Sequence, residues 1–69
     1  MNNGEFLKTV GSKVRAARKQ RQMTLKDVCS KTGLHISNVS FFENGRINPH
    51  LLTLKIFADL FEMDVKDFL

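Results

Sequence analysis

The chain has 69 residues, 42% of them hydrophobic and 26% charged, and a formal net charge of +4. A chain this short holds one domain with a small core, and its composition excludes a disordered tail. No apolar run approaches the ~20 residues of a membrane span. The first residues, MNNGEFLKTVG, lack the basic and apolar regions of a signal peptide. We therefore expect a single domain over residues 1–69.

Charge is unevenly distributed along the chain. Residues 1–46 carry nine Lys or Arg and three Asp or Glu, a net charge of +6, whereas residues 47–69 carry two and four, a net charge of −2. A basic surface favours a polyanion such as nucleic acid, or an anionic membrane surface, and it also serves plain solubility. The single cysteine, Cys29, cannot form an internal disulfide, so we expect a reducing, cytoplasmic compartment.

The first predicted helix runs from about Gly4 to Arg21. Apolar residues recur there at spacings of three and four, as on one face of an amphipathic helix, and this face consists of Phe6, Val10, Val14 and Ala17. Gly11 interrupts the helix at a modest cost in stability. No stretch of the chain alternates apolar and polar residues, so we expect no strands.

The second predicted helix has a clear start and a clear end. Thr24 is a good N-cap, and Asp27, three residues later, completes a capping box. Met23 and Val28 flank the cap with the spacing of a hydrophobic staple. Gly33 ends the helix, as a glycine in the left-handed conformation does.

The third predicted helix starts near Ile36 and ends at Asn44-Gly45. The short glycine turn before it makes the second and third helices cross at a steep angle. Their inner positions are Val28, Cys29, Leu34, Val39 and Phe42, and we interpret the cysteine as a small packing residue and not as a reactive thiol.

Two further helices are predicted in the C-terminal third. Pro49 suits the first position of a helix that runs from about His50 to Phe61. Its inward residues are Leu51, Leu54, Phe57, Ala58 and Phe61. A short fifth helix, from about Val65 to Leu69, follows the cap Asp64. The sequence thus predicts an all-α, compact five-helix domain.

The segment TLKDVCSKTGLHISNVSFFENG resembles the helix-turn-helix of the lambdoid phage-repressor and Cro family, the xenobiotic-response-element type. The flanking segments VGSKVRAARKQRQMT and INPHLLTLKIFADLFEMDVKDFL resemble the family's first helix and its last two, so the resemblance covers about residues 10–69. The residues that carry it in order are Arg18, Thr24, Gly33, Val39, Glu43, Gly45, Pro49, Leu54, Ala58 and Phe68. The GLH at the turn also resembles the small controller proteins of restriction–modification systems.

The resemblance implies a λ-repressor-like DNA-binding domain with its helix-turn-helix at residues 24–44. Residues 36–43 would be the recognition helix, which enters the major groove of double-stranded DNA with its N-terminal end nearest the bases. The implied base contacts are Ile36, Ser37, Asn38 and Phe41. The implied phosphate contacts are Thr24, Leu25, Ser40, Asn44, Gly45, Arg46 and Arg15. In the family, the residues matching Arg18 and Glu43 form a structural ion pair that orients the recognition helix.

Several positions depart from the family's pattern. Leu25 replaces a glutamine that contacts phosphate, His35 replaces a Ser or Thr cap, and Glu62 replaces a glycine. Ile36 and Phe41 are apolar where polar base readers are common. Three roles remain open for Phe41: contact with thymine methyl groups, contact with a protein partner, or partial burial against Leu25.

The family resemblance further implies a small homodimeric transcriptional regulator, a repressor or autoregulator, on a near-palindromic operator. The dimerisation region is expected at about residues 50–69, through Leu52, Ile56, Leu60 and Leu69, which are apolar residues left over from the core face. The alternative is a protein-binding module of the same fold, an antirepressor or an antitoxin. We see no catalytic pair, phosphate loop or zinc spacing among His35, His50 and Cys29. We therefore expect no enzyme, metal, cofactor or small-molecule ligand.

Overall fold

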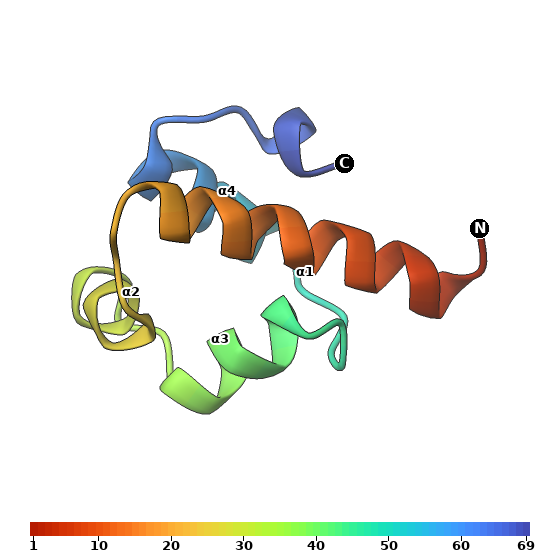
Figure 1. Cartoon of the computed structure of the whole chain (residues 1–69), viewed down its shortest axis with the longest axis horizontal. Helices are drawn as coiled ribbons and strands as arrows, with labels where there is room; N and C mark the ends of the chain where they lie inside the picture. Colours follow the sequence, from red (N-terminus) through yellow and green to blue (C-terminus); the bar gives the residue numbers. More distant parts are fainter.

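The computed structural model describes residues 1–69 and contains only helices (Figure 1). The elements are α1 (Asn3–Gln20), α2 (Leu25–Thr32), α3 (Ile36–Glu43), α4 (Leu51–Phe61) and the 3-10 helix η1 (Val65–Phe68). In Figure 1, α3 lies on one side of α1, and η1 lies on the other. None of the helices is both long and apolar enough to cross a bilayer.

The predicted all-α class is confirmed, but the fifth helix is not an α-helix. Residues Val65–Phe68 form one 3-10 turn, in which the Asp67 N–H donates to the Asp64 carbonyl at 2.9 Å. A four-residue segment is too short for a run of i→i−4 hydrogen bonds, so the tighter pattern prevails. Phe68, at its end, is fully buried, and this anchors the C-terminal segment on the core.

Helix α1 buries only part of its predicted face. Val10, Val14 and Ala17 are buried, whereas Phe6 is 44% exposed. The apolar face predicted from the spacing is therefore buried at three of its four positions, and Phe6 is the exception. Figure 1 shows the reason: the first turns of α1 extend beyond α3 and η1, so fewer elements cover them.

Helix α4 supplies two of the four buried phenylalanines, Phe57 and Phe61. Phe57 stacks on Phe42 of α3 with ring centroids 5.3 Å apart, and on Phe61 at 6.3 Å. Leu54 and Ala58 are buried beside them, as predicted. Leu51 is 71% exposed, so its inward assignment is wrong.

The start of α4 explains this difference. His50 is the N-cap, so Pro49 precedes the cap and does not occupy the first helical position that the sequence predicts. Leu51 is therefore the first residue of α4, at its N-terminal end.

Two glycines allow α1 to approach the end of α3 closely. A Cβ at Gly11 would collide with the Phe42 carbonyl oxygen and would lie 2.8 Å from that of Glu43. A Cβ at Gly45 would lie 2.7 Å from the Cα of Lys8. From the sequence, Gly11 was expected only to lower the stability of the helix modestly. In the structure it fixes the distance between α1 and the C-terminal end of α3.

Helix α4 ends at a residue with an unfavourable backbone conformation. Glu62 has φ 57° and ψ 47°, the left-handed region, which costs a non-glycine residue about 1–2 kcal/mol. Glu62→Gly removes this cost but adds about 0.4–1 kcal/mol of unfolded-chain entropy. We expect the free energy of unfolding to rise by about 0.5 kcal/mol, measured by urea denaturation.

Gly33 is the matched control for this substitution. It caps α2 with φ 78°, and a Cβ there would meet nothing within 4 Å. Gly33→Ala should therefore change backbone strain alone and lower stability by about 1 kcal/mol. A higher free energy of unfolding in Glu62→Gly together with a lower one in Gly33→Ala would support backbone strain as the cause. A loss of stability in Glu62→Gly would contradict it.

Candidate nucleic-acid interface

Helices α2 and α3 form a helix-turn-helix whose local hydrogen bonds match the sequence prediction. The Asp27 N–H donates to the Thr24 hydroxyl oxygen at 3.0 Å, and the Thr24 N–H donates to the Asp27 carboxylate at 2.8 Å. Gly33 closes the helix in the left-handed conformation, its N–H bonded to the Cys29 carbonyl at 2.9 Å. Cys29 is partly buried and packs against the core, which agrees with a packing role.

The capping box also sets the ionisation of Asp27. Its pKa lies below the ordinary value of 3.8, mainly because the carboxylate accepts a hydrogen bond from the Thr24 N–H. The charged form therefore stabilises the folded state above pH 3.8, and this contribution is lost as the pH falls through the lowered pKa. At neutral pH the box is intact.

Helix α3 presents one face to the core and the opposite face to solvent. Val39 and Phe42 are buried. Ser37 and Phe41, one turn apart, project on the opposite side of the helix. Phe41 is 43% exposed and Ile36 is 45% exposed. The predicted base-contacting residues therefore include two exposed apolar side chains.

Asn38 lies at the edge of this exposed face. It is exposed and borders a groove lined also by Leu34, Pro49 and Thr53. Ser40 is partly buried, and its carbonyl accepts a hydrogen bond from the Asn44 side-chain amide at 2.8 Å. The exposed polar groups of α3 thus extend from its first turn to its C-cap.

His35 caps α3 more effectively than the sequence suggested. Its ring nitrogen Nδ1 accepts a hydrogen bond from the Ser37 N–H at 3.2 Å. One orphan donor of the first turn is therefore satisfied by imidazole in place of the usual hydroxyl. This fixes the entry of the chain into α3.

The ion pair between Arg18 and Glu43 is present and buried. Arg18 Nε donates to Glu43 Oε2 at 2.7 Å, and Nη2 donates to Oε1 at 3.0 Å. A third donor, Nη1, binds the Met23 carbonyl at 2.8 Å. The hydrogen bonds with Glu43 raise the pKa of the guanidinium against the opposing effect of burial. The pair therefore joins α1, the start of the α2 segment and the end of α3.

The start of α2 offers hydrogen-bond donors that the chain does not use. No backbone acceptor receives the N–H groups of Leu25 and Lys26. The Leu25 side chain is partly buried against the core, so the position can contact phosphate only through its amide. Thr24 and Lys26 are exposed beside it. Free amides, a hydroxyl and an ammonium group at a helix N-terminus suit an anion.

A second group of donors follows α3. Asn44 is exposed, Gly45 adopts φ 71°, and Arg46 is exposed with no side-chain partner. Its N–H donates to the Phe41 carbonyl at 2.8 Å, which holds the loop against the helix. The two donor groups therefore flank α3 at its two ends.

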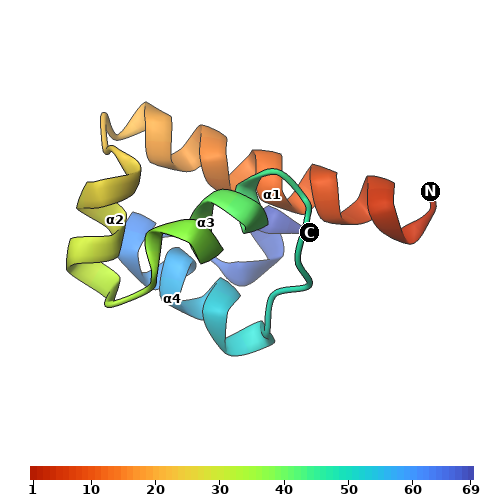
Figure 2. The same cartoon turned by 90° about the horizontal axis from the view of Figure 1, so that it is seen from below.

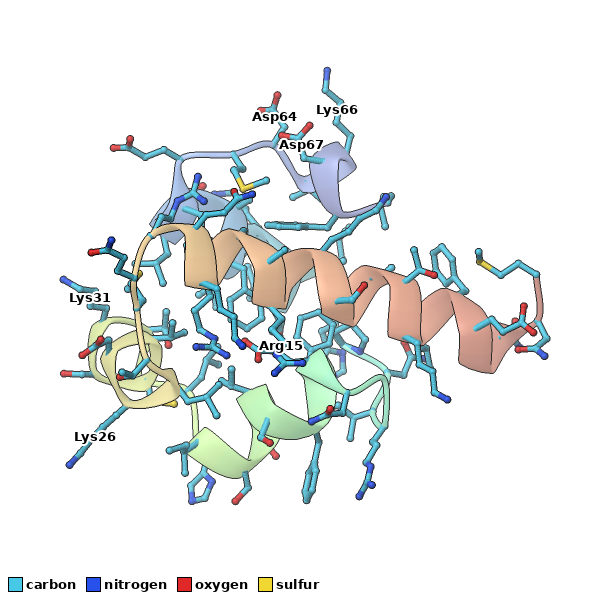
Figure 3. All side chains as sticks on the ribbon, in the orientation of Figure 1. Arg15, Lys26, Lys31, Asp64, Lys66 and Asp67 are labelled. Atoms are coloured by element: carbon cyan, nitrogen blue, oxygen red, sulfur yellow. The ribbon has the colours of Figure 1, made fainter.

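Figure 3 shows where the labelled charges lie relative to α3. Arg15 leaves α1 on the flank that borders α3, and Lys26 points outward from α2 on the same side. Asp64 and Asp67 project from the opposite side of the molecule, beyond α1. Lys66 projects beside them, so that side carries charges of both signs, whereas Arg15 and Lys26, the labelled side chains on the side of α3, are both basic.

One basic residue has a structural role that the sequence did not reveal. Arg21 donates through Nε and Nη2 to the Phe61 carbonyl at 3.1 and 2.7 Å, and its guanidinium carbon lies 5.3 Å from the centre of the Phe61 ring. It therefore closes the C-terminal end of α4. Together with Arg18, it takes two basic residues away from nucleic-acid contact.

The four residues expected at a dimer surface do not share one environment. Leu52 is 68% exposed and Leu69 is 57% exposed. Ile56 and Leu60 are partly buried, and Leu60 packs against the core.

Comparisons with known proteins point to one fold. The family model HTH_3, described as helix-turn-helix, matches residues 14–68. The solved DNA-binding domain of BldD gives a TM-score of 0.87 at 28% identity, covering 100% of this chain and 99% of that one. The restriction-modification controller protein C.AhdI from Aeromonas hydrophila gives 0.86 at 21% identity, over 91% and 96%.

A third solved structure, an HTH_3 family transcriptional regulator from Vibrio cholerae, gives a TM-score of 0.87 at 22% identity. The match covers 97% of this chain and 38% of that chain. No curated protein matches significantly.

Proposed function

Because this chain belongs to the helix-turn-helix family HTH_3, as its sequence led us to expect, we propose that it binds double-stranded DNA and regulates transcription. Helix α3 would lie in the major groove as the recognition helix. Ile36, Ser37, Asn38 and Phe41 would contact base edges. The protein would act as a homodimer on a near-palindromic operator, as a repressor or autoregulator.

The observation that carries this proposal is the position of α3 between the free amides at the start of α2 and the Arg46 guanidinium, which has no partner in the chain. An α-helix with its side chains is about 10–12 Å across, which fits a major groove about 12 Å wide. In Figure 1, α2 lies toward the N-terminal end of α3, and the loop that contains Arg46 leaves its C-terminal end. Phosphate contacts of this kind hold a recognition helix in register while its outer side chains read bases.

Two arguments support the homodimer: one recognition helix alone binds DNA weakly, and two symmetry-related copies can read two half-sites. A single short helix makes few base contacts, and two copies related by a two-fold axis read two half-sites about 34–36 Å apart. Control by protein concentration would then suffice for regulation. This expectation makes an inverted repeat the natural form of the operator.

Arg46→Ala tests the phosphate contacts most directly. Loss of one phosphate contact should weaken binding to all duplexes similarly and reduce the slope of log K against log salt by about 1 per subunit. The measurement is a fluorescence titration of labelled duplex DNA at several salt concentrations.

Lys66→Ala is the control, because Lys66 lies on the side of the molecule opposite α3 (Figure 3). Its salt slope should equal that of the wild type. Equal slopes for all three proteins would contradict the assigned orientation. Absence of binding at low salt would contradict the proposed function itself.

Phe41 provides a test of base reading. We expect its ring to pack on thymine methyl groups. Replacing each contacted thymine by uracil removes one methyl group, and wild-type affinity should fall about fourfold per methyl, corresponding to about 0.8 kcal/mol. Phe41→Ala should bind thymine and uracil duplexes equally well. A folded Phe41→Ala variant with unchanged affinity and unchanged thymine preference would rule out this role.

The exposed apolar pair on α3 also supports a second candidate function, a protein-binding module that acts as an antirepressor or antitoxin. Ile36 and Phe41 are 45% and 43% exposed, and exposed apolar residues mark protein interfaces. The duplex titration separates the two functions, because a protein-binding module would show no salt-dependent complex with DNA.

A further inference from the structure

The chain contains two Asn-Gly dipeptides, Asn3-Gly4 at the start of α1 and Asn44-Gly45 at the end of α3. Asparagine is a thermolabile residue, because the backbone nitrogen of the next residue can attack its side-chain amide. Glycine in that next position makes the attack easiest, since it has no Cβ to hinder ring closure and leaves the backbone free to bend. Both dipeptides are therefore candidates for spontaneous deamidation.

Deamidation at Asn44 needs no reactant except water. The Gly45 nitrogen loses its proton and forms a bond to the side-chain carbonyl carbon Cγ of Asn44, while the bond from Cγ to Nδ2 breaks and ammonia leaves. Water then opens the resulting succinimide ring at either of its carbonyl groups. The product is aspartate or isoaspartate, and nothing is oxidised or reduced. The reaction thus replaces a neutral amide by a carboxylate.

The fold requires the glycine of the second dipeptide. Gly45 adopts φ 71°, a conformation that residues with a side chain rarely adopt. A Cβ at this position would also lie 2.7 Å from the Cα of Lys8. Asn44, the residue before it, is the C-cap of α3. The close approach of α1 to this loop therefore places a chemically reactive dipeptide directly after α3.

In the folded domain, hydrogen bonds hold both reacting groups of Asn44-Gly45. The Asn44 side-chain Nδ2 donates to the Ser40 carbonyl at 2.8 Å, and the Gly45 N–H donates to the Phe42 carbonyl at 3.0 Å. The succinimide ring cannot close until both bonds break, because the amide must turn and the backbone nitrogen must lose its proton. Figure 2 shows that this loop also runs beside α1. Deamidation at Asn44 therefore requires a local opening at the end of α3.

The first dipeptide lacks this protection. Asn3 is exposed and is the first residue of α1. The side-chain hydrogen bonds at this helix start belong to Asn2, which binds Glu5. No backbone acceptor receives the Gly4 N–H, and the first turn of a chain frays readily. Asn3-Gly4 is therefore an internal reference, with the same two residues in the same chain but without the two hydrogen bonds.

We infer that Asn44-Gly45 is a deamidation site that is closed in the folded domain, becomes reactive when the C-terminal turn of α3 opens, and lowers DNA affinity once modified. The effect on affinity rests on the proposed function. A carboxylate at position 44 removes the donor to the Ser40 carbonyl and adds negative charge at the negative end of the helix dipole. It also lies two residues before Arg46, the proposed phosphate contact, and opposes its charge.

Peptide mapping by mass spectrometry measures both deamidation rates in one sample. The wild type is incubated in mildly alkaline buffer, which speeds loss of the backbone proton, and in the same buffer with enough urea to unfold it. In urea, Asn3 and Asn44 should deamidate at similar rates. In the folded protein, Asn44 should react at least about tenfold more slowly than Asn3, since two hydrogen bonds must break first.

Asn44→Gln is the control for the chemistry, because its additional methylene disfavours ring closure while the neutral amide is kept. No deamidation should appear at position 44 of this variant under either condition, and Asn3 should react as in the wild type. Equal rates at Asn3 and Asn44 in the folded wild type would overturn the protection. An Asn44 that stays intact in urea while Asn3 reacts would overturn the site.

A duplex titration measures the effect on DNA affinity and separates it from the proposed function. Asn44→Asp reproduces one product of deamidation, whereas Asn3→Asp adds the same charge where α1 extends beyond α3 (Figure 1). Asn44→Asp should bind at least about tenfold more weakly than the wild type, and Asn3→Asp within about twofold of it.

Equal affinities of the two folded aspartate variants would overturn the effect of deamidation on DNA binding. A wild type that binds no duplex would refute the proposed function, whereas slow deamidation of Asn44 in that same folded protein would still uphold the site.

Discussion

Glu43→Ala is expected to remove a large part of the stability of the domain at 25 °C. The substitution strands the charge of Arg18, whose side chain is 10% exposed and whose guanidinium would lose two of its three hydrogen bonds. Removing one partner of a buried pair costs about 3–5 kcal/mol. A domain of this length has a total stability of about 3–10 kcal/mol. The measurement is urea denaturation followed by circular dichroism.

The exposed pair between Lys55 and Asp59 is the control. Its atoms lie 2.7 Å apart, as in the buried pair, but its side chains are 62% and 66% exposed. Lys55→Ala should cost no more than about 0.5 kcal/mol. Equal, small effects of Glu43→Ala and Lys55→Ala would show that burial of Arg18 does not determine the stability of α3.

Gly11→Ala is the second substitution for which we expect a large effect. Its Cβ would collide with the Phe42 carbonyl oxygen and crowd that of Glu43, and both atoms belong to the backbone. Rotation of a side chain cannot relieve such a clash, so α3 must move away from α1. Overpacking of this kind costs about 1–3 kcal/mol, and the displaced helix should also bind DNA less tightly. Thermal denaturation and a duplex titration measure the two effects.

Gly4→Ala in the same helix provides the comparison. A Cβ there would meet only the Asn2 side-chain oxygen at 3.5 Å, an ordinary contact. It should raise stability by up to about 1 kcal/mol, because alanine favours a helix over glycine. A Gly11→Ala variant as stable as Gly4→Ala would contradict the close packing of α1 on α3.

Local signals in the sequence predicted the local structure well. Thr24, Asp27 and Gly33 belong to one helix and its two caps, and each acts through neighbours three or four residues away, so their roles could be inferred from spacing. The bounds of the helices agree with the prediction within a few residues for the same reason. The pairing of Arg18 with Glu43 spans 25 residues, and it was anticipated only through the family resemblance.

Features that depend on distant parts of the chain were missed. Periodicity gives the face of a helix but not how far the core extends along it, so Leu51 was assigned to the core and the apolar face of α1 was extended to Phe6. Gly11 was visible as a glycine within an apolar face, yet nothing in the sequence identified the carbonyl groups it meets. The contact of Arg21 with Phe61 joins residues 40 apart, and composition counted this arginine simply as a positive charge.

Selection of bound duplexes from a random pool tests the central claim most directly, namely that the outer face of α3 reads DNA sequence. The wild type should enrich an inverted repeat with half-site centres about 10 base pairs apart. A variant carrying Ser37→Ala, Asn38→Ala and Phe41→Ala should lose or change that motif while it remains folded. Failure of the wild type to enrich any motif, or enrichment of the same motif by the triple variant, would contradict the claim.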